Sequence, residues 1–190
     1  MHKTYVLDTS ALIQDPFCYK QFKNSDVVIP ISVLNELDKL KKQPAQAGRN
    51  ARVAIRGIDE ISDLGDISVG IIIENDIVVK VDTHYIDLYN STYTSFGDPS
   101  YGDTQILATL HYNWVNHPTN DVCLVSNDIN LRVKAKARGI EAISNKEKYD
   151  ADDLYSGLQI VKDEVAGLDL QQGFIDPRAY GLNLNTFSPG

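Results

Sequence analysis

The chain has 190 residues, a hydrophobic share of 43% and a formal net charge of −8 at pH 7. The hydrophobic share is ordinary for a globular protein with a real core, and the absence of a run of about 18 apolar residues excludes a membrane-spanning helix. The acidic balance argues against simple electrostatic binding of nucleic acid, because phosphate contacts need Lys and Arg. With no signal-peptide pattern and only two cysteines, we expect a cytoplasmic protein.

Strand and helix signals alternate along the chain, which favours a parallel sheet flanked by helices. The first elements predicted, in order, are a strand at Tyr5–Leu7, a short helix near Ala11, a helix from Pro16 to Phe22, a strand at Val27–Ile29 and a helix that starts at Pro30 and ends at Gln43-Pro44. The last of these helices has an apolar stripe at helical spacing, so we expect it to pack against the sheet.

A second long helix is predicted from Gln46 to about Leu64 and has two distinct faces. The apolar face carries Ala51, Ala54, Ile55, Ile58 and Ile61. The opposite face carries Arg49, Arg52 and Arg56. The ordinary interpretation of such a basic stripe is a solvated surface. The functional interpretation is a stripe that contacts phosphates beside an acidic site.

Residues 66–100 look like an elaboration of the domain. The apolar runs 71–73 and 77–79 flank Glu74-Asn75-Asp76, which predicts an inserted β-hairpin. The polar stretch from Asn90 to Gly102 is predicted to be a loop. Because it leads directly into Asp103, it is a candidate lid over that residue.

The remaining elements complete the expected fold. They are a helix from Asp103 to about Asn116, a strand at Val122–Val125, a basic helix from Ile129 to Arg138 and a short strand at Ile140–Ile143. We therefore predict a three-layer α/β/α domain over residues 1–149, built on a central, mainly parallel sheet of four or five strands. After Tyr149 the pattern fades, so residues 150–190 are predicted to be a linker or tail.

Four acidic residues stand where the predicted strands lead into helices. They are Asp8, Glu36, Asp103 and Asp128. In parallel sheets, ligands bind outside the carboxyl ends of the strands. Carboxylates gathered there repel one another unless a cation joins them, and oxygen-rich sites suit Mg²⁺ or Mn²⁺. The pattern predicts a metal site.

Each of these acids also has a purely structural interpretation. Asp8 can form an Asx-turn, and Asp103 and Asp128 can cap the helices that follow them. Glu36 borders an apolar stripe, where a glutamate is usually just solvated. The joint pattern favours the metal-site hypothesis, because all four residues map to the same end of the predicted sheet.

Short segments in a fixed order carry a family resemblance. They are Val6-Leu7-Asp8-Thr9-Ser10, the strand–Pro–helix with Glu36, Gly102-Asp103-Thr104-Gln105-Ile106, and Ser126-Asn127-Asp128 with Leu131-Arg132. From about Tyr5 to Ile143, the chain resembles a PIN domain, the nuclease-like α/β fold of toxin and RNA-processing proteins. The resemblance implies a divalent-metal-dependent endoribonuclease that cleaves single-stranded RNA. Its catalytic metal ligands would be Asp8, Glu36, Asp103 and Asp128, with Thr9 and Ser126 supporting them.

Three further segments carry a narrower resemblance. They are Gly48-Arg49-Asn50-Ala51-Arg52, Asp153-Leu154-Tyr155-Ser156-Gly157 and Leu184-Asn185-Thr186-Phe187. They are similar to the PIN domain fused in front of a PhoH-type ATPase. The chain has no Gly-x-x-x-x-Gly-Lys-[Ser/Thr] phosphate loop, so it carries no ATPase of its own. The resemblance implies that residues 150–190 lead to a carboxyl-terminal ATPase domain. The sequence leaves the number of metal ions and the oligomeric state open, a homo-oligomer included.

Two functional hypotheses follow for the basic and acidic residues together. In the first, Arg49, Arg52, Arg56 and Arg132 hold single-stranded RNA by its backbone beside the catalytic carboxylates. In the second, the domain is a non-catalytic RNA-binding or regulatory module attached to a PhoH-type ATPase or helicase. Four intact carboxylates favour catalysis. A phosphatase of the haloacid dehalogenase type would need an acid where Ser10 stands.

Overall fold

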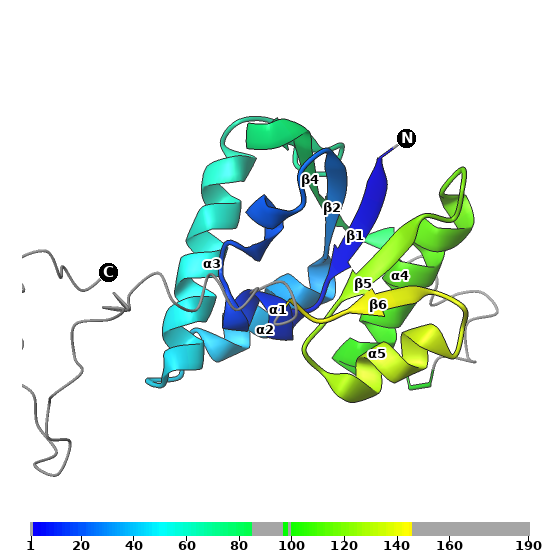
Figure 1. The fold of residues 1–190 in the computed structure, drawn as a ribbon. Helices are drawn as coiled ribbons and strands as arrows, with labels where there is room; N and C mark the ends of the chain where they lie inside the picture. The colour runs from blue at the N-terminus through cyan, green and yellow to red at the C-terminus, as the bar shows by residue number, and fades with distance from the viewer. Residues whose placement is uncertain (1, 85–96, 99, 146–190) are drawn as a thin grey trace, which may run out of the picture. The chain divides into compact units, whose positions relative to one another are not determined.

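The computed structural model describes residues 2–84, 97, 98 and 100–145. Within these residues, six strands form one sheet in the order β3-β4-β2-β1-β5-β6 (Figure 1). The strands are β1 (Lys3–Leu7), β2 (Ser25–Pro30), β3 (Ile71–Ile73), β4 (Ile77–Asp82), β5 (Val122–Val125) and β6 (Glu141–Ile143). The helices are α1 (Thr9–Gln14), α2 (Ile31–Leu40), α3 (Gln46–Ser62), α4 (Gly102–Asn116) and α5 (Ile129–Lys136), with the short 3₁₀ turns η1 (Cys18–Gln21) and η2 (Glu74–Asp76).

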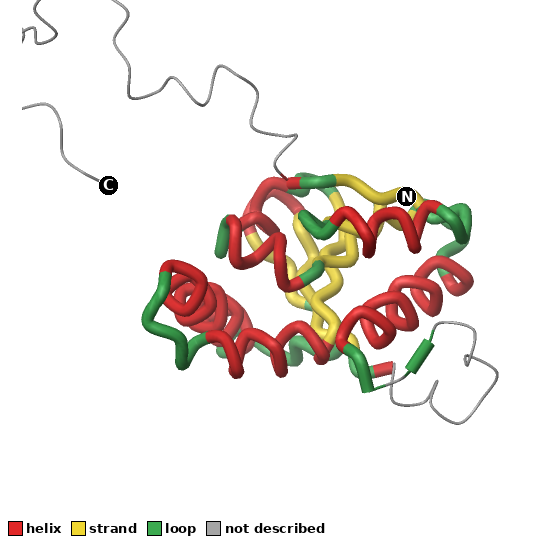
Figure 2. The backbone as a smooth tube through the Cα atoms, turned by 90° about the horizontal axis from the view of Figure 1, so that it is seen from below, coloured by secondary structure: helices red, strands yellow, loops and turns green. Residues whose placement is uncertain are grey.

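The central sheet is mainly parallel, which confirms the predicted fold class. β1 pairs in parallel with β2 and β5, β2 with β4, and β5 with β6, and β3 alone runs antiparallel to its neighbour. β5 is a continuous buried apolar run and β2 contains another at Val27–Ile29, as expected for strands covered on both faces. Figure 2 shows these strands lying between helices. Their carboxyl ends therefore meet at one edge of the sheet.

The predicted hairpin is an antiparallel pair, but it is part of the central sheet and not a separate insertion. β4 pairs with β2 from Ser25↔Ile77 to Pro30↔Asp82, so the sheet has six strands and not four or five. The physical reason is that the outer edge of β2 has backbone groups that need partners. The turn uses Asn75 and Asp76 at φ values of 60° and 55°, a conformation that short polar side chains tolerate.

The helices largely follow the predicted patterns. α3 buries Ala51, Ala54, Ile58 and Ile61 and packs against α1 and α2. The helix predicted from Pro16 to Phe22 is only the turn η1, because one turn suffices to bury Cys18 and Tyr19. Within the described residues, no helix combines the length and the apolar character needed to cross a membrane. The predicted linker or tail and most of the candidate lid lie outside the described residues.

Candidate metal and RNA site

Asp8 is the buried centre of the candidate site. It follows β1 directly and is 5% exposed. The hydroxyls of Ser10 and Ser126 both donate hydrogen bonds to its Oδ2, the latter at 2.6 Å. Burial raises the pKa of Asp8, those two hydrogen bonds oppose the rise, and the negative charge of Glu36 adds to it. The site thus holds a carboxylate in surroundings that disfavour its negative charge.

A hydrogen-bonded network fixes the loop that follows β5 around this carboxylate. Besides donating to Asp8, Ser126 Oγ accepts the backbone N–H of Asp128 at 3.0 Å. The backbone N–H of Asn127 donates to Ser10 Oγ at 2.8 Å. The guanidinium of Arg132 donates to the Ser126 carbonyl at 2.7 Å. Two of these contacts join the β1–α1 junction to the β5–α5 junction, and the other two lie within the β5–α5 junction. Together they fix the positions of the two junctions relative to each other.

Glu36 is tied to Asp8 through the residue between them. It is an exposed residue of α2, and Thr9 Oγ1 donates a hydrogen bond to its Oε2 at 2.6 Å. Thr9 is itself buried at the start of α1. Among the described residues, neither Asp8 nor Glu36 forms an ion pair with Lys, Arg or His. The negative charge of Glu36 thus acts on Asp8, and within the described residues no Lys, Arg or His is paired with either carboxylate.

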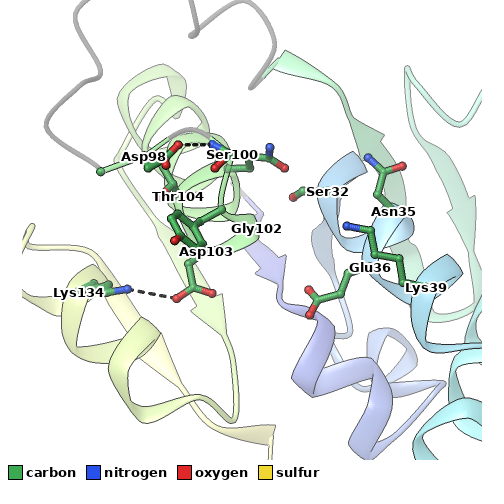
Figure 3. Close-up of a pocket in the computed structure, with 13 residues that line it drawn as sticks. Ser32, Asn35, Glu36, Lys39, Asp98, Ser100, Gly102, Asp103, Thr104 and Lys134 are labelled. Atoms are coloured by element: carbon green, nitrogen blue, oxygen red, sulfur yellow. Dashed lines mark hydrogen bonds and ion pairs between the residues drawn. The ribbon is translucent and has the colours of Figure 1, made fainter. Parts of the chain in front are cut away.

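The other two predicted ligands have protein partners. Asp103 lies in the first turn of α4, and Lys134 of α5 forms an ion pair with it at 3.1 Å (Figure 3). Asp128 caps α5, its Oδ1 accepting the backbone N–H groups of Asn130 and Leu131 at 2.7 and 3.3 Å. Asp128 therefore acts as the N-cap of α5, which is the structural role that the sequence also allowed. A cation that binds Asp103 has to compete with Lys134.

A cavity of about 670 Å³ lies between α2 and the amino-terminal end of α4. Glu36 and Asp103 both line it, which places two of the predicted ligands on one hollow (Figure 3). The remaining walls include Ser32, Asn35, Lys39, Tyr101 and Lys134. Asp8 does not line the cavity, but its neighbour Thr9 donates a hydrogen bond to Glu36, which does.

The residues present suit a hard divalent cation, although they are not assembled as a complete set. Carboxylate oxygens are the ligands that Mg²⁺ and Mn²⁺ prefer, and the Asp8–Glu36 pair has unbalanced negative charge. Within the described part of the chain, however, no three His, Cys, Asp or Glu side chains are grouped as a metal site. The contacts of Asp103 with Lys134 and of Asp128 with α5 give a physical reason.

Sequence reasoning missed three residues that shape this edge of the sheet. Ser10 and Asn127 belong to the Asp8 network. Lys134, expected on a basic surface that contacts RNA, forms an ion pair with Asp103 instead. Asp82 ends β4 and is buried. The signal for Asp82 was available, since it ends the strand-like segment 77–82, which opens with the apolar run 77–79.

Asp82 is held by three hydrogen bonds. Asn113 Nδ2 donates to Oδ2 at 2.8 Å, and the backbone N–H and ring Nδ1 of His84 contact Oδ1 at 2.8 and 2.7 Å. Burial opposes ionisation, but the hydrogen bonds from His84 and Asn113 lower the pKa of Asp82 overall. The carboxylate therefore joins the end of β4 to α4.

The predicted RNA-binding arginines fall into two places. Arg132 contacts the Ser126 loop and so belongs to the candidate site. Arg49, Arg52 and Arg56 are exposed on α3, where Arg49 donates to Gln46 and Arg52 to the carbonyl of Lys41. No contact joins this stripe to the carboxylates within the described residues, so its role in binding stays a prediction.

Comparisons with known proteins identify the family of this chain. The model of the PIN domain family matches residues 5–146. The chain belongs to the PIN domain family. It is also 32% identical over 163 residues to the protein PhoH2 of Bacillus subtilis, a match that covers 83% of this chain and 36% of that protein. PIN domains are in general nucleases that use divalent metal ions.

Two further PhoH2 proteins show similar agreement. The one from Thermobispora bispora is 34% identical and covers 78% of this chain, and the one from Mycolicibacterium smegmatis is 32% identical and covers 92%. The matches cover 32% and 39% of those two proteins, so the chain spans roughly a third of the length of these relatives. A solved domain of a functionally unknown protein from Methanocaldococcus jannaschii is 18% identical with a TM-score of 0.46, and the match covers 75% of this chain and 90% of that domain.

Proposed function

We propose that this PIN domain is a divalent-metal-dependent endoribonuclease that cleaves single-stranded RNA. The observation that carries the proposal is the pair of neighbouring carboxylates, Asp8 and Glu36, which has no ion pair to Lys, Arg or His within the described residues. A buried carboxylate without a compensating charge costs free energy. A bound cation supplies that charge, and membership of a family of nucleases supports a catalytic use for it.

Asp8, Glu36, Asp103 and Asp128 are the residues that would hold Mg²⁺ or Mn²⁺. A bound cation of this kind supplies an activated water and neutralises charge on a phosphate. The protein's own part is orientation. Ser126 and Ser10 fix the carboxylate of Asp8, and Thr9 fixes that of Glu36. Their hydrogen bonds keep the oxygens in place before a substrate arrives, which is the arrangement that catalysis by charge stabilisation needs.

We propose that four arginines bind the phosphates of the RNA. Arg132 is positioned beside the carboxylates through its bond to the Ser126 carbonyl, so it is the arginine best placed to hold the cleaved segment of RNA. We assign the exposed stripe of Arg49, Arg52 and Arg56 to backbone contacts farther along the strand. Such contacts carry no sequence information.

The experiment that tests the function is a nuclease assay on single-stranded RNA and DNA with Mn²⁺, Mg²⁺ or a chelator. We expect the chelator to abolish RNA cleavage. Asp8→Asn should lower the rate at least about 100-fold, because even residues that only orient a metal ligand contribute about 10- to 100-fold. The matched control is Asp26→Asn, since Asp26 lies near the amino-terminal end of β2, away from the carboxyl-end edge. Full activity of Asp8→Asn would remove Asp8 from the site.

The same assay separates this function from the second candidate, a non-catalytic RNA-binding or regulatory module. The absence of a complete three-ligand group in the described residues is the observation that favours this alternative. RNA binding with no cleavage under any metal would support it. The resemblance to PhoH-type fusions and the similarity to PhoH2 proteins support a PhoH-type ATPase domain as the partner in either case.

A further inference from the structure

Ser32 is a buried polar residue that the proposed reaction does not use. It lies in the first turn of α2, is 4% exposed, and its Oγ has no hydrogen-bond partner among the described residues. A buried hydroxyl without a partner destabilises the folded state, and such groups are rare enough to need an explanation. Ser32 lines the cavity between α2 and α4, and Figure 3 shows its side chain extending from α2 toward the α4 side. The hydroxyl oxygen is closed to solvent in this arrangement, and a rotation of the Ser32 side chain would bring it to a ligand in the cavity.

The other walls of the cavity have the chemistry that a nucleobase needs. Tyr101 stands immediately before α4 with 65% of its surface exposed, and an exposed aromatic ring is a stacking surface for a base. Asn35 lies one turn after Ser32 on α2 and offers an amide that both donates and accepts hydrogen bonds. Lys39, a further turn along, adds a positive charge on the same side. A cavity of about 670 Å³ has room for a base and its sugar.

We propose that this cavity binds an unpaired base of the RNA strand, next to the phosphate that is cleaved. Tyr101 stacks on the face of the base, Ser32 and Asn35 hydrogen-bond its edge, and Lys39 contacts the adjoining backbone. The proposal rests on the proposed function, because Glu36 and Asp103 line the same cavity as these residues. It adds a base-binding subsite to a domain whose other RNA contacts are to the backbone.

An unpaired base fits these walls better than a paired one. Proteins that read single strands stack splayed bases on aromatic rings and hydrogen-bond their exposed edges. In a duplex the Watson–Crick edge is already occupied and the face is stacked on its neighbours. The cavity therefore gives a structural reason for a preference for single-stranded RNA.

The test is an abasic scan of a short single-stranded RNA against the 190-residue chain. Each RNA lacks one base, and binding is measured by fluorescence anisotropy with a chelator present, so that no cleavage occurs. We expect one position at which loss of the base weakens binding roughly tenfold, the scale of one stacked base. Tyr101→Ala should abolish this position dependence, and Tyr101→Phe should keep it, because the ring is retained.

Ser32→Ala and Asn35→Ala should also weaken binding of the intact RNA while leaving the abasic RNA unaffected. Ser32→Ala should not lower the melting temperature, since it removes a hydroxyl that has no partner. Asn116→Ala is the control, because Asn116 is an exposed asparagine at the far end of α4. It should bind every RNA as the unaltered chain does.

The outcomes separate this subsite from the proposed function. A flat abasic scan from a chain that still cleaves RNA would overturn the base-binding subsite alone. A chain that neither binds nor cleaves RNA would overturn both. Unchanged RNA affinity in Ser32→Ala, with the position dependence intact, would remove Ser32 from the subsite and leave the stacking on Tyr101.

Discussion

Two buried serines mark the two sides of the site and differ in every contact they make. Ser126, at the end of β5, is fully buried, and its hydroxyl both donates to Asp8 and accepts from the backbone of Asp128. Ser32, at the start of α2, is almost as buried and its hydroxyl has no partner among the described residues. The hydroxyl of Ser126 is satisfied in both of its roles, and that of Ser32 is an unmet hydrogen-bonding group among the described residues.

The difference between Ser126 and Ser32 indicates separate roles for the two sides of the site. The β1–β5 side fixes the carboxylate of Asp8 through a network in which each polar group is satisfied, and such a network is rigid. The α2–α4 side lines a cavity, and in its wall Ser32 Oγ has no hydrogen-bond partner among the described residues. Departures from full hydrogen bonding occur at functional sites. Ser126 is therefore used within the protein to orient Asp8, whereas Ser32 remains available to a ligand in the cavity that Glu36 and Asp103 also line.

The strongest test of the comparison is Ser126→Ala. It removes a donor to Asp8 and an acceptor for the Asp128 backbone at once. We expect the free energy of unfolding to fall by about 1–3 kcal/mol, the cost of leaving buried partners unsatisfied. Cleavage should fall about tenfold or more, because Asp8 is no longer oriented. Chemical denaturation and a single-turnover assay measure the two effects.

Ser32→Ala is the matched variant, because it makes the same chemical change on the opposite side of the site. Its free energy of unfolding should stay equal or rise. If the two variants lose the same stability, both hydroxyls have partners in solution and the distinction between the two sides is wrong.

A second test concerns pH and Asp82, a buried carboxylate whose hydrogen bonds join the end of β4 to α4. The lowered pKa of Asp82 means that the folded state favours its carboxylate over the acid form. The stabilisation is therefore present above the ordinary value of 3.8 and is lost as the pH falls through the lowered, folded value. Asp82→Asn should be about 1–3 kcal/mol less stable than the unaltered chain near pH 7. The difference should shrink below a pH of about 3.8.

Denaturation curves across this pH range give the measurement, and Asp63→Asn is the control because Asp63 is exposed at the end of α3. It should show no such pH-dependent difference. A constant gap between Asp82→Asn and the unaltered chain at every pH would mean that the hydrogen bonds of Asp82, and not its charge, join β4 to α4.

The smallest expected effect concerns the arginine stripe on α3. Replacing Arg49 and Arg52 by Ala should weaken RNA binding about equally for all sequences. The slope of log affinity against log salt should fall in magnitude by roughly 1.4, since each phosphate contact with a single strand contributes about 0.7. Binding titrations at several salt concentrations measure it. The charge-matched control replaces the exposed Lys20 and Lys23, and an equal slope change there would mean that only net charge matters.

The sequence by itself determined the elements and their order. Apolar residues at spacings of two and of three to four depend on geometry within one strand or helix, so the parallel core strands and the two faces of α3 could be predicted. The acids at strand ends could also be found, because parallel strands place their carboxyl ends at one edge. The resemblance to PIN domains, which the family match confirms, rests on these same short segments.

The contacts between distant segments depend on how the elements pack in the folded domain. Lys134 reaches Asp103 across 31 positions and Ser126 reaches Asp8 across 118, and no local pattern encodes such a contact. The hairpin joined the central sheet because β2 had a free edge, which is a property of the assembled sheet. Ser32 looked like an ordinary residue at a helix start. Its burial beside a cavity, with no partner in the described residues, depends on where α2 and α4 pack, because a missing hydrogen bond exists only once the surroundings are folded.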